Sequence, residues 1–469
     1  MSQRLLTFVV WPALALAGGC GGGGGSDPAL RAGEWSQFVA RGDLTEGPAE
    51  QAALPPNPTL RDCLTHAALN NAELRAAFHR WQAAVERIAQ ARALPDPKLT
   101  YGYYFLEVET RVGPQRQSFS LSQTFPWFGK LELRGDEAAE LAKAKWHAFQ
   151  AEKLKLYAEV KKAYCEYYYL GRAVSITRDN LKLLEQLERL VRTRYAAGAA
   201  THPDLIRLQV ELGKLTDRLQ SLEQMRRPAT ARLNAVMGRP DSADELPWPT
   251  SLAEEALAAS RSQLAEWLRQ HNPALRAMDA EAAAADKRVE LAKKDYWPDV
   301  TLAGTFIDTR NRVGAGRPAD SGQDAVVGMV TVNLPIWWNK LAAAVREARH
   351  SRWAAALRRV QAARNLAAEL DRALYEFEDA GRRAELYSRT LLPKGRESLK
   401  VTQTGFAAGT SGFNDLIDAQ RVLLEFELSY QRALADRAIW RAEIERLVGR
   451  PLTEQRQPAT SPSRDADGR

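Results

Sequence analysis

The first residue in this sequence whose position points to chemistry is Cys20, at the end of the run "LALAGGC". Arg4 precedes an apolar segment, Leu5–Ala17, that has the length of a signal-peptide core and is too short for a membrane-crossing helix. A cysteine at the cleavage point is typical of a bacterial lipoprotein signal. We therefore expect residues 1–19 to be a signal peptide, Cys20 to carry lipid, and residues 20–59 to form a lipid-tethered linker. An ordinary cleaved signal or an uncleaved anchor is the alternative.

The remaining thiols and imidazoles predict neither a metal site nor a nucleophile. Cys63 and Cys165 lie in helical patterns far apart in the sequence, so we expect free, buried thiols, with a disulfide as the alternative. The histidines lack the close spacing of metal ligands, and no paired cysteine motif accompanies them. The sequence also has no glycine-rich phosphate loop, nucleophile elbow or metal box, so it predicts no enzyme and no cofactor. The histidines are His66, His79, His147, His202, His271 and His350.

Two similar stretches, "YAAGAATHPDLIRLQ" from Tyr195 and "FAAGTSGFNDLIDAQ" from Phe406, gather glycine, hydroxyl and acidic side chains. In each stretch a glycine can adopt the positive φ that ends a helix. A hydroxyl side chain and an aspartate then suit the start of another helix. Each stretch therefore predicts the tip of an antiparallel helical hairpin. The residues in these roles are Gly198, Thr201 and Asp204 in the first stretch, and Gly409, Ser411 and Asp415 in the second.

The two tips belong to two copies of one longer pattern. The segments "NNAELRA", "LPD", "FPWFGK" and "VMGRP" recur in the same order as "HNPALRA", "WPD", "LPIWWNK" and "LVGRP". The separation between copies grows from 201 positions at the first landmark (272 − 71 = 201) to 211 at the tips (406 − 195 = 211), because the second copy has extra loop residues. We expect repeats at 60–240 and 256–451, a linker at 241–255, and a flexible tail at 452–469.

Each repeat contains two segments with the alternating pattern of β-strands. In the first repeat, Phe119, Leu121 and Phe125 alternate with serines and a threonine, so one face is apolar and the other carries small hydroxyl groups. Segments of this length suit tilted, membrane-crossing strands. Aromatic residues at the strand ends predict a membrane-interface belt, with the edge of a soluble sheet as the alternative. The expected strands are residues 99–110, 117–125, 300–309 and 326–334, and the belt residues are Trp127, Phe128, Trp297, Trp337 and Trp338.

Each repeat is expected to open with a helix, at roughly 64–93 and 272–294, and long helices are expected between the strands and the tips. No proline interrupts residues 130–197, and a helix of that length would reach ~100 Å. Its apolar residues recur every three or four positions, which is coiled-coil spacing. The second copy runs from about 340 to 408, with a kink expected at Pro393. The returning helices share the spacing of their apolar residues and also a following arginine, Arg226 or Arg437. The predicted fold is mainly α, with two coiled-coil hairpins and four membrane β-strands per chain.

Four strands and two long hairpins are incomplete in one chain. A sheet that crosses a membrane must close so that no backbone group stays unpaired in lipid, and single-chain barrels need at least about eight strands. The hairpins likewise have apolar seams, and a single chain cannot bury both sides of such long hairpins. Copies of the chain must therefore assemble side by side into a tube with a helical part and a β-stranded part. A tube with a polar lining and a lipid-facing belt is a conduit.

The landmarks "NAELRA" with "NPALRA", "LPDP" with "WPD", "FPWFGK" with "LPIWWNK", and the two tips resemble those of the TolC-type outer-membrane efflux proteins, or outer-membrane factors. The resemblance covers about Leu60 to Pro451. It implies a homotrimer with a twelve-stranded barrel in the outer membrane of a Gram-negative-type cell and an α-barrel tunnel in the periplasm. The implied partners are a periplasmic adaptor (membrane fusion) protein, an inner-membrane RND-type pump and outer-membrane lipid.

The same resemblance assigns roles to the tips. Asp415 and Asp418 match acids that narrow the periplasmic end of the tunnel, whereas the first tip keeps Asp204 and has Arg207 in the second acidic position. Three copies of such acids around an axis would bring like charges together and attract cations. The alternative is that these acids stabilise helix N-termini. The match to the adaptor-docking region covers Tyr195, Gly198, Thr201, Phe406, Gly409 and Ser411.

The expected function is that of a passive exit duct in a tripartite efflux system. "FPWFGK" resembles the branch that serves heavy-metal RND exporters, and drugs or secreted products are the other substrate classes. A periplasmic coiled-coil adaptor or scaffold lipoprotein is the main alternative, but it does not account for paired strands at the same place in both repeats. A net charge of +7, spread over mixed basic and acidic residues, argues against a nucleic-acid partner.

Overall fold

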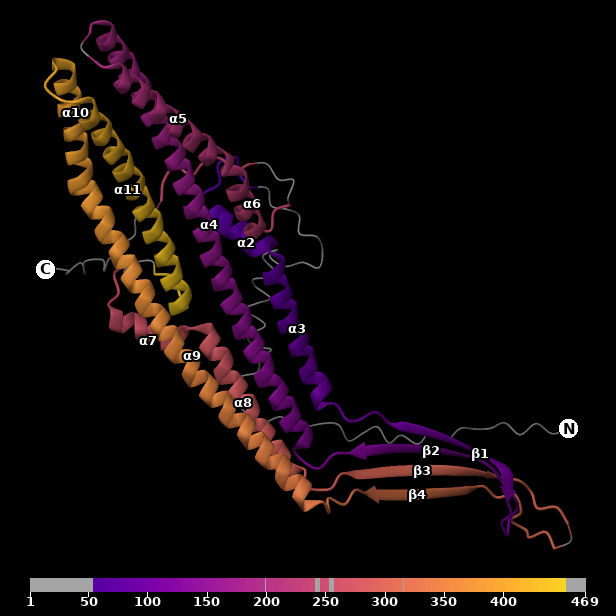
Figure 1. Ribbon diagram of the computed structural model, residues 1–469. Helices are drawn as coiled ribbons and strands as arrows, with labels where there is room; N and C mark the ends of the chain where they lie inside the picture. Colours follow the sequence, from indigo (N-terminus) through magenta and orange to yellow (C-terminus); the bar gives the residue numbers. More distant parts are fainter. Residues whose placement is uncertain (1–53, 199, 241–244, 253–256, 315, 453–469) are drawn as a thin grey trace, which may run out of the picture. The chain divides into compact units, whose positions relative to one another are not determined.

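The chain is mainly helical, with one four-stranded sheet, in a computed structural model (Figure 1). Cys20 and the expected signal peptide lie outside the described residues, which are 54–198, 200–240, 245–252, 257–314 and 316–452. In chain order the elements are α2 (Leu60–Asn70), α3 (Ala72–Arg92), β1 (Lys98–Val108), β2 (Gln115–Phe125), α4 (Lys130–Ala196), α5 (His202–Gln224), α6 (Arg226–Met237), α7 (Arg261–His271), α8 (Pro273–Lys294), β3 (Val300–Thr309), β4 (Ala325–Val332), α9 (Trp338–Leu386), the π-helical turn η1 (Tyr387–Leu391), α10 (Leu392–Ala408) and α11 (Phe413–Val448).

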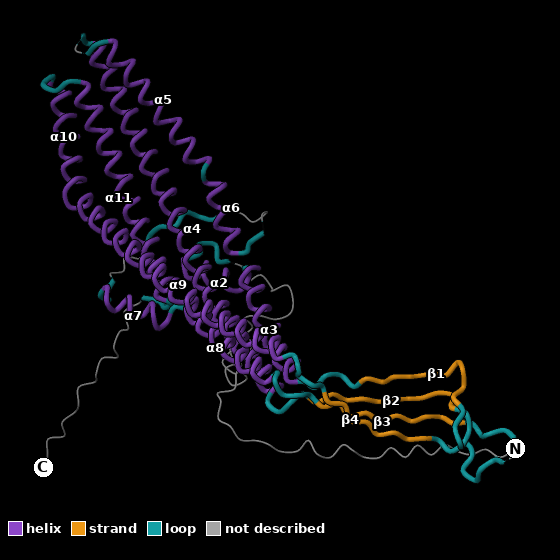
Figure 2. Tube along the Cα trace, turned by 60° about the horizontal axis from the view of Figure 1, so that its bottom comes forward, coloured by secondary structure: helices purple, strands orange, loops and turns teal. Residues whose placement is uncertain are grey.

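The four strands form one antiparallel sheet in the order β1-β2-β3-β4, so β1 and β4 are its two edges (Figures 1 and 2). β2 of the first repeat pairs with β3 of the second from Phe125↔Val300 to Gln115↔Thr309, which joins the two repeats through backbone hydrogen bonds. The alternation of apolar and small polar residues predicted all four strands. Their ends lie within two residues of the expected positions.

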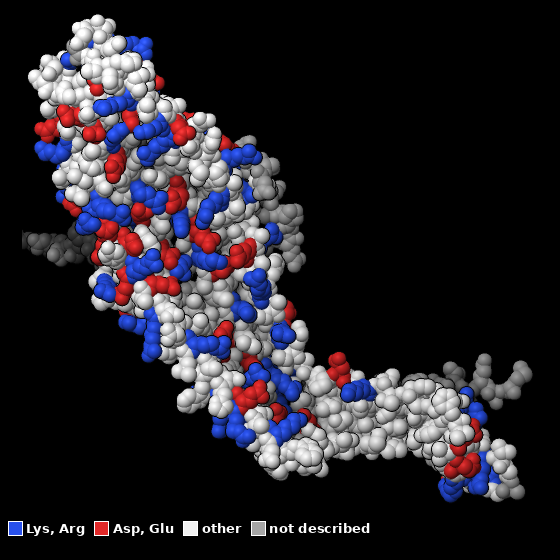
Figure 3. All heavy atoms as spheres, in the orientation of Figure 1, with Lys and Arg blue, Asp and Glu red and all other residues white. Residues whose placement is uncertain are grey.

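One face of the sheet is mainly apolar, and the other carries most of the small hydroxyl residues together with Ile307, Val327 and Met329. On the polar face, hydroxyls meet across strands: Ser120 Oγ lies 2.8 Å from Thr305 Oγ1, and Thr124 Oγ1 lies 2.8 Å from Thr301 Oγ1. Figure 3 shows few charged side chains over the strands and many over the helices. The cross-strand register gathers Leu99, Tyr101, Tyr103, Phe119, Leu121, Leu302, Phe306, Val326, Val330 and Val332 on the apolar face.

The long helix α4 is the centre of the helical part and contacts α3, α8, α11 and α5. Against α3 it packs indole rings, with the centroids of Trp81 and Trp146 4.9 Å apart. Among the described residues, no helix combines the length and apolar character of one that crosses a membrane. The predicted coiled-coil seam of α4 is buried within the single chain, at Leu156, Val160, Ala163, Tyr167, Leu170 and Val174.

The duplication in the sequence is also a duplication in space. Asn71 ends α2, and its side-chain Nδ2 donates to the carbonyl of Val236 at 3.0 Å. Asn272 ends α7 in the second repeat, and its Nδ2 donates to the carbonyl of Leu447 at 2.8 Å. Each asparagine also accepts a hydrogen bond at the start of the next helix. One side chain therefore caps a helix and fixes the end of the returning helix in both repeats.

Two helices are interrupted where the periodic pattern did not predict it, and a third contains a π-helical turn just before Pro393, where a kink was expected. The opening helix expected at 64–93 is two helices that meet at Asn71, because this residue is extended and caps α3. The first returning helix breaks at Met225, between α5 and α6. In the second repeat, helix continues through Pro393, with η1 just before it. A π-turn accommodates one extra residue, which matches the growth in repeat separation from Lys130 and Lys340 (340 − 130 = 210) to the tips.

The described part of the expected linker, residues 245–252, packs on the first repeat. Trp248 stacks on Tyr167 of α4 with ring centroids 4.5 Å apart. The guanidinium of Arg226 lies 4.8 Å from the centre of the Trp248 ring. Gly171 makes this possible, because a Cβ at that position would lie 2.8 Å from the indole. The linker therefore covers the place where the first returning helix breaks.

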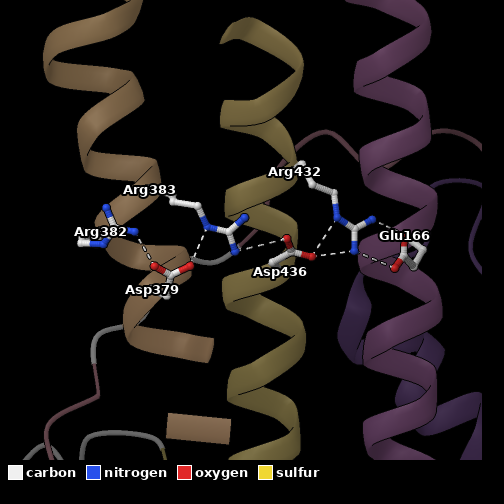
Figure 4. Close-up of polar contacts among 6 residues, drawn as sticks. All are labelled: Glu166, Asp379, Arg382, Arg383, Arg432 and Asp436. Atoms are coloured by element: carbon white, nitrogen blue, oxygen red, sulfur yellow. Dashed lines mark hydrogen bonds and ion pairs between the residues drawn. The ribbon is translucent and has the colours of Figure 1, made fainter. Parts of the chain in front are cut away.

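A row of alternating charges connects α9 and α11 of the second repeat to α4 of the first (Figure 4). At its centre Asp436 accepts from Arg432 at 2.6 Å and lies 3.9 Å from Arg383. Arg432 also donates to Glu166 at 2.7 Å, and hydrogen bonding to that carboxylate raises the pKa of the arginine above its ordinary value. The row runs from Arg382 through Asp379, Arg383, Asp436 and Arg432 to Glu166.

Candidate functional site

The first tip (residues 195–204) is open. Gly198 has a φ of +75°, and a Cβ built there would meet no atom within 4 Å. Thr201 donates to Asp204 Oδ2 from its backbone nitrogen at 3.1 Å and from Oγ1 at 2.6 Å, so this aspartate completes a capping box for α5. Tyr195 is 43% exposed, with its ring 5.7 Å from that of His202. The first tip therefore presents an aromatic surface to solvent.

The second tip (residues 406–415) is packed. Gly409 has a φ of +83°, and Thr410 donates its backbone N–H to the carbonyl of Gly405 at 2.8 Å. Phe406 is only 5% exposed, and its ring centroid lies 6.3 Å from that of Phe413. Arg194 of the first hairpin lies 4.9 Å from the centre of the Phe406 ring, a cation–π contact between the hairpins. Phe406, which we expected on the docking surface, is thus an internal anchor of the tip in this chain.

Polar side chains link the two hairpins just behind the tips. Arg207 of α5 donates to Asn414 Oδ1 of α11 at 3.0 Å. Arg421 of α11 reaches Glu211 of α5 with Nη2 2.5 Å from Oε1. This hydrogen bond lowers the pKa of Glu211 below its ordinary value. Arg207, which stands where the second tip has an acid, therefore makes a hydrogen bond between the two hairpins.

The three predicted gate acids have different surroundings. Asp415 accepts from the backbone nitrogen of Gly412, the N-cap of α11, at 3.1 Å, which is the same backbone contact that Asp204 makes at α5, although a glycine has no side chain to complete a capping box. The Asp418 side chain is 71% exposed, and its one ion-pair contact among the described residues is with Arg421, at 3.5 Å. Helix capping, the alternative to the gate, therefore describes Asp204 and Asp415 within one chain. Asp418 is the acid that remains most available to solvent.

The predicted belt aromatics surround the junction where the strands meet the helices. Trp127 stacks on Trp297 with ring centroids 5.1 Å apart and planes at 9°. Phe128, Trp337 and Trp338 are largely exposed. At the opposite ends of the strands, the loops and the last residues of β1 carry charged pairs instead, among them Arg111 with Asp320 and Arg310 with Glu107. The strands thus run between an aromatic end and a charged end.

A buried lysine also lies at this strand–helix junction. Lys130 is only 3% exposed, and its Nζ lies 2.8 Å from Asp299 Oδ1 and 3.0 Å from the carbonyl of Trp297. The backbone nitrogen of Trp127 donates to the same carboxylate oxygen at 2.8 Å. Burial alone would raise the pKa of Asp299, but these hydrogen bonds lower it overall. The pair ties the end of β2 to the start of β3.

The thiols and imidazoles lie away from these sites. Cys63 and Cys165 are free and buried, and desolvation raises their pKa values to about 11 and about 12. His66 is buried with Nδ1 3.2 Å from the carbonyl of Met237, which gives it a structural contact between α2 and α6. No group of three potential metal ligands occurs among the described residues.

Sequence reasoning missed the residues that hold the site together. Arg194, Glu211 and Arg421 act between hairpins that are far apart in the sequence, so no local pattern marks them. Lys130 and Asp299 could have been found, because they end the repeated landmark "FPWFGK" and the landmark "WPD". A lysine next to an apolar run and an aspartate next to another strand are a plausible buried pair only once β2 and β3 are known to be neighbours.

The fold and the duplicated pattern match known proteins. The model of the outer membrane efflux protein family matches residues 63–239 and again 264–450. The cobalt-zinc-cadmium resistance protein CzcC of Cupriavidus metallidurans is 23% identical over 84% of this chain and 90% of its own length. The pyoverdine export outer membrane protein OpmQ of Pseudomonas aeruginosa is 26% identical over 78% of this chain and 80% of its own length.

A solved structure has the same fold. The outer membrane protein VceC of Vibrio cholerae superposes with a TM-score of 0.69, over 84% of this chain and 97% of that protein, at 17% sequence identity. Both repeats, the sheet and the hairpins are therefore parts of one known architecture.

Proposed function

We propose that this chain, which belongs to the outer membrane efflux protein family, is the exit duct of a tripartite efflux system. Three copies would contribute four strands each to a twelve-stranded barrel in the outer membrane. Their hairpins would form a tunnel through the periplasm toward an adaptor and an inner-membrane RND-type pump. The role is passive, in keeping with a family of efflux proteins and not of enzymes.

The two-faced sheet with open edges is the observation that carries this proposal. Its apolar face has exposed aromatic and branched side chains in the single chain, and its other face pairs hydroxyl groups. Both β1 and β4 are edge strands, and such edges cannot remain unpaired in lipid. When copies of the chain close the sheet into a barrel, the apolar face can contact lipid and the hydroxyl-bearing face can contact water.

Conductance of the purified protein tests the duct directly. We expect a heat-modifiable trimer in outer-membrane fractions that forms ion-conducting pores in planar bilayers. A water-soluble monomer without β-structure in detergent would refute the proposal.

The exposed acid of the second tip is our candidate for the narrowest point. A ring of three Asp418 carboxylates would favour cations, and its exposure in the single chain leaves it free to face an axis. Asp418→Ala is then expected to lower the preference for cations over anions and to raise conductance. Asp415→Asn serves as the matched control for Asp418→Ala, since Asp415 already caps α11. Unchanged conductance and ion preference in Asp418→Ala would remove this residue from the gate.

The first tip is our candidate for the adaptor-docking surface. Tyr195 is exposed there, and Ile206 and Val210 add exposed apolar side chains on α5. Gly198, Thr201, Gly409 and Ser411 shape the turns around them. Tyr195→Ala is expected to weaken co-purification of the adaptor while leaving the trimer intact. Normal adaptor recovery with Tyr195→Ala, Ile206→Ser and Val210→Ser combined would exclude this surface.

Substrate class is set by the partner pump in our proposal, and heavy-metal cations are the first class to test. The "FPWFGK" motif and the likeness to CzcC favour metals, whereas the likeness to OpmQ favours export of a compound such as pyoverdine. Deletion of the gene is expected to lower tolerance to cobalt, zinc or cadmium. If deletion lowered tolerance to drugs but not to these metals, the duct would belong to a drug-export system and not to a heavy-metal exporter.

A lipid anchor at Cys20 would hold the N-terminus at the membrane whether the protein is an efflux duct or a periplasmic scaffold lipoprotein. If the protein were instead a periplasmic scaffold lipoprotein, Cys20→Ser would release it into the soluble fraction. For a barrel, we expect Cys20→Ser to stay in the outer membrane, because the apolar sheet face holds it there. Fractionation of the Cys20→Ser variant therefore distinguishes the membrane barrel from the scaffold lipoprotein.

A further inference from the structure

We propose that Lys340 of one copy forms a buried pair with Asp96 of the next copy, so that the contact closing the ring reproduces a contact within the chain. This inference rests on the proposed trimeric duct and names the residues of its subunit interface. The partner is a second copy of this chain, joined head to tail.

The template is the strand–helix junction between β2 and β3. There Lys130, which follows β2, inserts its ammonium group beside Asp299, which precedes β3, at 2.8 Å. The carboxylate also accepts from the backbone nitrogen of Trp127 at 2.8 Å. Trp127 covers the pair by stacking on Trp297. One lysine, one aspartate and two apolar side chains thus connect the first repeat to the second.

Every member of this junction has a counterpart in the other repeat. Lys340 corresponds to Lys130 and Trp337 to Trp127, each 210 positions on (340 − 130 = 210; 337 − 127 = 210). Asp96 corresponds to Asp299 (299 − 96 = 203), and Leu94 corresponds to Trp297 by the same separation. Lysine and aspartate are identical in both sets. The apolar cover changes from Trp/Trp to Trp/Leu.

The counterparts cannot meet within one chain. Lys340 follows β4 and Asp96 precedes β1, and these strands are the opposite edges of the sheet (Figures 1 and 2). Both side chains are exposed, and neither has an ion-pair partner among the described residues. If β4 of one copy pairs with β1 of the next as β2 pairs with β3, Lys340 and Asp96 come together.

Exposed apolar side chains accompany the charged pair on both edges. Trp337 is 72% exposed, and Leu94 is exposed as well. In the template the equivalent rings shield the ion pair from water, which strengthens the attraction between the charges. A contact of unlike surfaces between copies is heterologous, and such contacts close into rings when the rotation permits. The lysine edge of each copy would therefore meet the aspartate edge of the next around the whole ring.

Cysteine cross-linking tests which edges meet. In the full-length chain, Lys340→Cys with Asp96→Cys is expected to give covalent dimers and trimers with a short bismaleimide. Lys130→Cys with Asp299→Cys should cross-link within one chain and give no ladder. Each single variant, Lys340→Cys or Asp96→Cys, should remain monomeric on a denaturing gel, because like edges do not meet. The native Cys63 and Cys165 are buried and common to all samples. A ladder from a single variant, or none from the double variant in a trimer, would overturn the proposal.

Charge exchange tests whether the pair matters for assembly. Lys340→Asp and Asp96→Lys are each expected to remove most of the heat-resistant trimer, because like charges then face each other across the interface. The two changes together should restore it. If both single variants keep a full trimer with wild-type conductance, the pairing is wrong although the duct stands. If the unmodified chain is not a trimer, the duct and the pairing are both wrong.

Discussion

The two helical hairpins come from one duplicated pattern, yet their irregularities lie in opposite arms. In the first hairpin the outgoing helix α4 is continuous and the returning helix breaks at Met225. In the second, the outgoing helix contains η1 and the returning helix α11 is continuous. Position 436, which corresponds to 225 (436 − 225 = 211), is an aspartate held by Arg432 and Arg383. The same pattern of apolar residues is thus compatible with a break or with a straight helix.

The arginine that follows this position shows how the copies diverged. Arg226 lies over Trp248 of the linker, whereas Arg437 lies 5.2 Å from the centre of the Phe377 ring of its own repeat. A linker residue therefore supplies part of the first arginine's surroundings. The comparison teaches that apolar periodicity sets which face of a helix is buried but does not set where the helix is interrupted.

The largest expected difference between the hairpins concerns their tips. Phe406→Ala is expected to destabilise the second tip by about 3–5 kcal/mol, because a buried ring and its contact with Arg194 are lost. Tyr195→Ala at the equivalent exposed position should cost only about 0.5 kcal/mol. Hydrogen exchange of the tip amides and thermal unfolding measure both. Equal effects would show that the two tips are packed alike.

The next largest effect on stability is expected when Asp436 and Met225, which occupy equivalent positions in the two returning helices, are each replaced by the other's residue type. Asp436→Met places the first repeat's residue into the second and leaves two arginines without their shared acid, at a cost of about 1–3 kcal/mol. The reverse change, Met225→Asp, affects an exposed residue and should cost about 0.5 kcal/mol. Thermal unfolding midpoints compare the pair. A neutral Asp436→Met would mean that the charged row does not hold α11 straight.

The glycines at the two tips allow a closer comparison. Gly198→Ala and Gly409→Ala should each cost roughly 1–2 kcal/mol, because alanine is strained at positive φ. The two costs should be similar, since the Cβ added at Gly409 would lie at an ordinary van der Waals distance, 3.4 Å, from the guanidinium of Arg194 and the one at Gly198 would meet no atom. Proteolysis rates at the tips and unfolding midpoints measure both. A negligible effect at both positions would contradict the positive φ of the two glycines.

The smallest expected effect depends on pH. Arg421 lowers the pKa of Glu211 in the folded chain, so this contact stabilises the protein above the ordinary glutamate value of 4.5. The stabilisation is lost as pH falls through the lower, folded-state value. Arg421→Gln should therefore reduce the thermal midpoint at neutral pH and reduce its loss between about pH 5 and pH 3. If the thermal midpoints of the wild type and Arg421→Gln fell in parallel as pH is lowered, the contact between Arg421 and Glu211 would not be a source of pH-dependent stability.

Much of the fold was predictable because the governing patterns are local. Strand alternation at Phe119 and Leu121 and the proline-free run of α4 are consequences of one buried face each, and both predictions are confirmed. The tips were predictable from glycine φ and from the threonine–aspartate cap. The repeat and linker bounds, the gate and the docking surface remain predictions.

The rest required contacts between distant segments. Burial of Phe406 depends on Arg194 of another hairpin, and the break at Met225 coincides with a tryptophan from the linker. A heptad pattern continues across such a break, because the apolar spacing is the same on both sides of it. The buried Lys130 was hidden for a similar reason, since its partner lies in the other repeat.

The open edges of the sheet have a consequence for how the protein is made. Helices such as α4 bury their seams within one polypeptide, so they can fold at a rate that does not depend on protein concentration. The last backbone hydrogen bonds of β1 and β4 must come from other molecules. Completion of the strands is therefore a reaction of higher order, which makes dilution a way to accumulate chains with finished hairpins and an unfinished sheet.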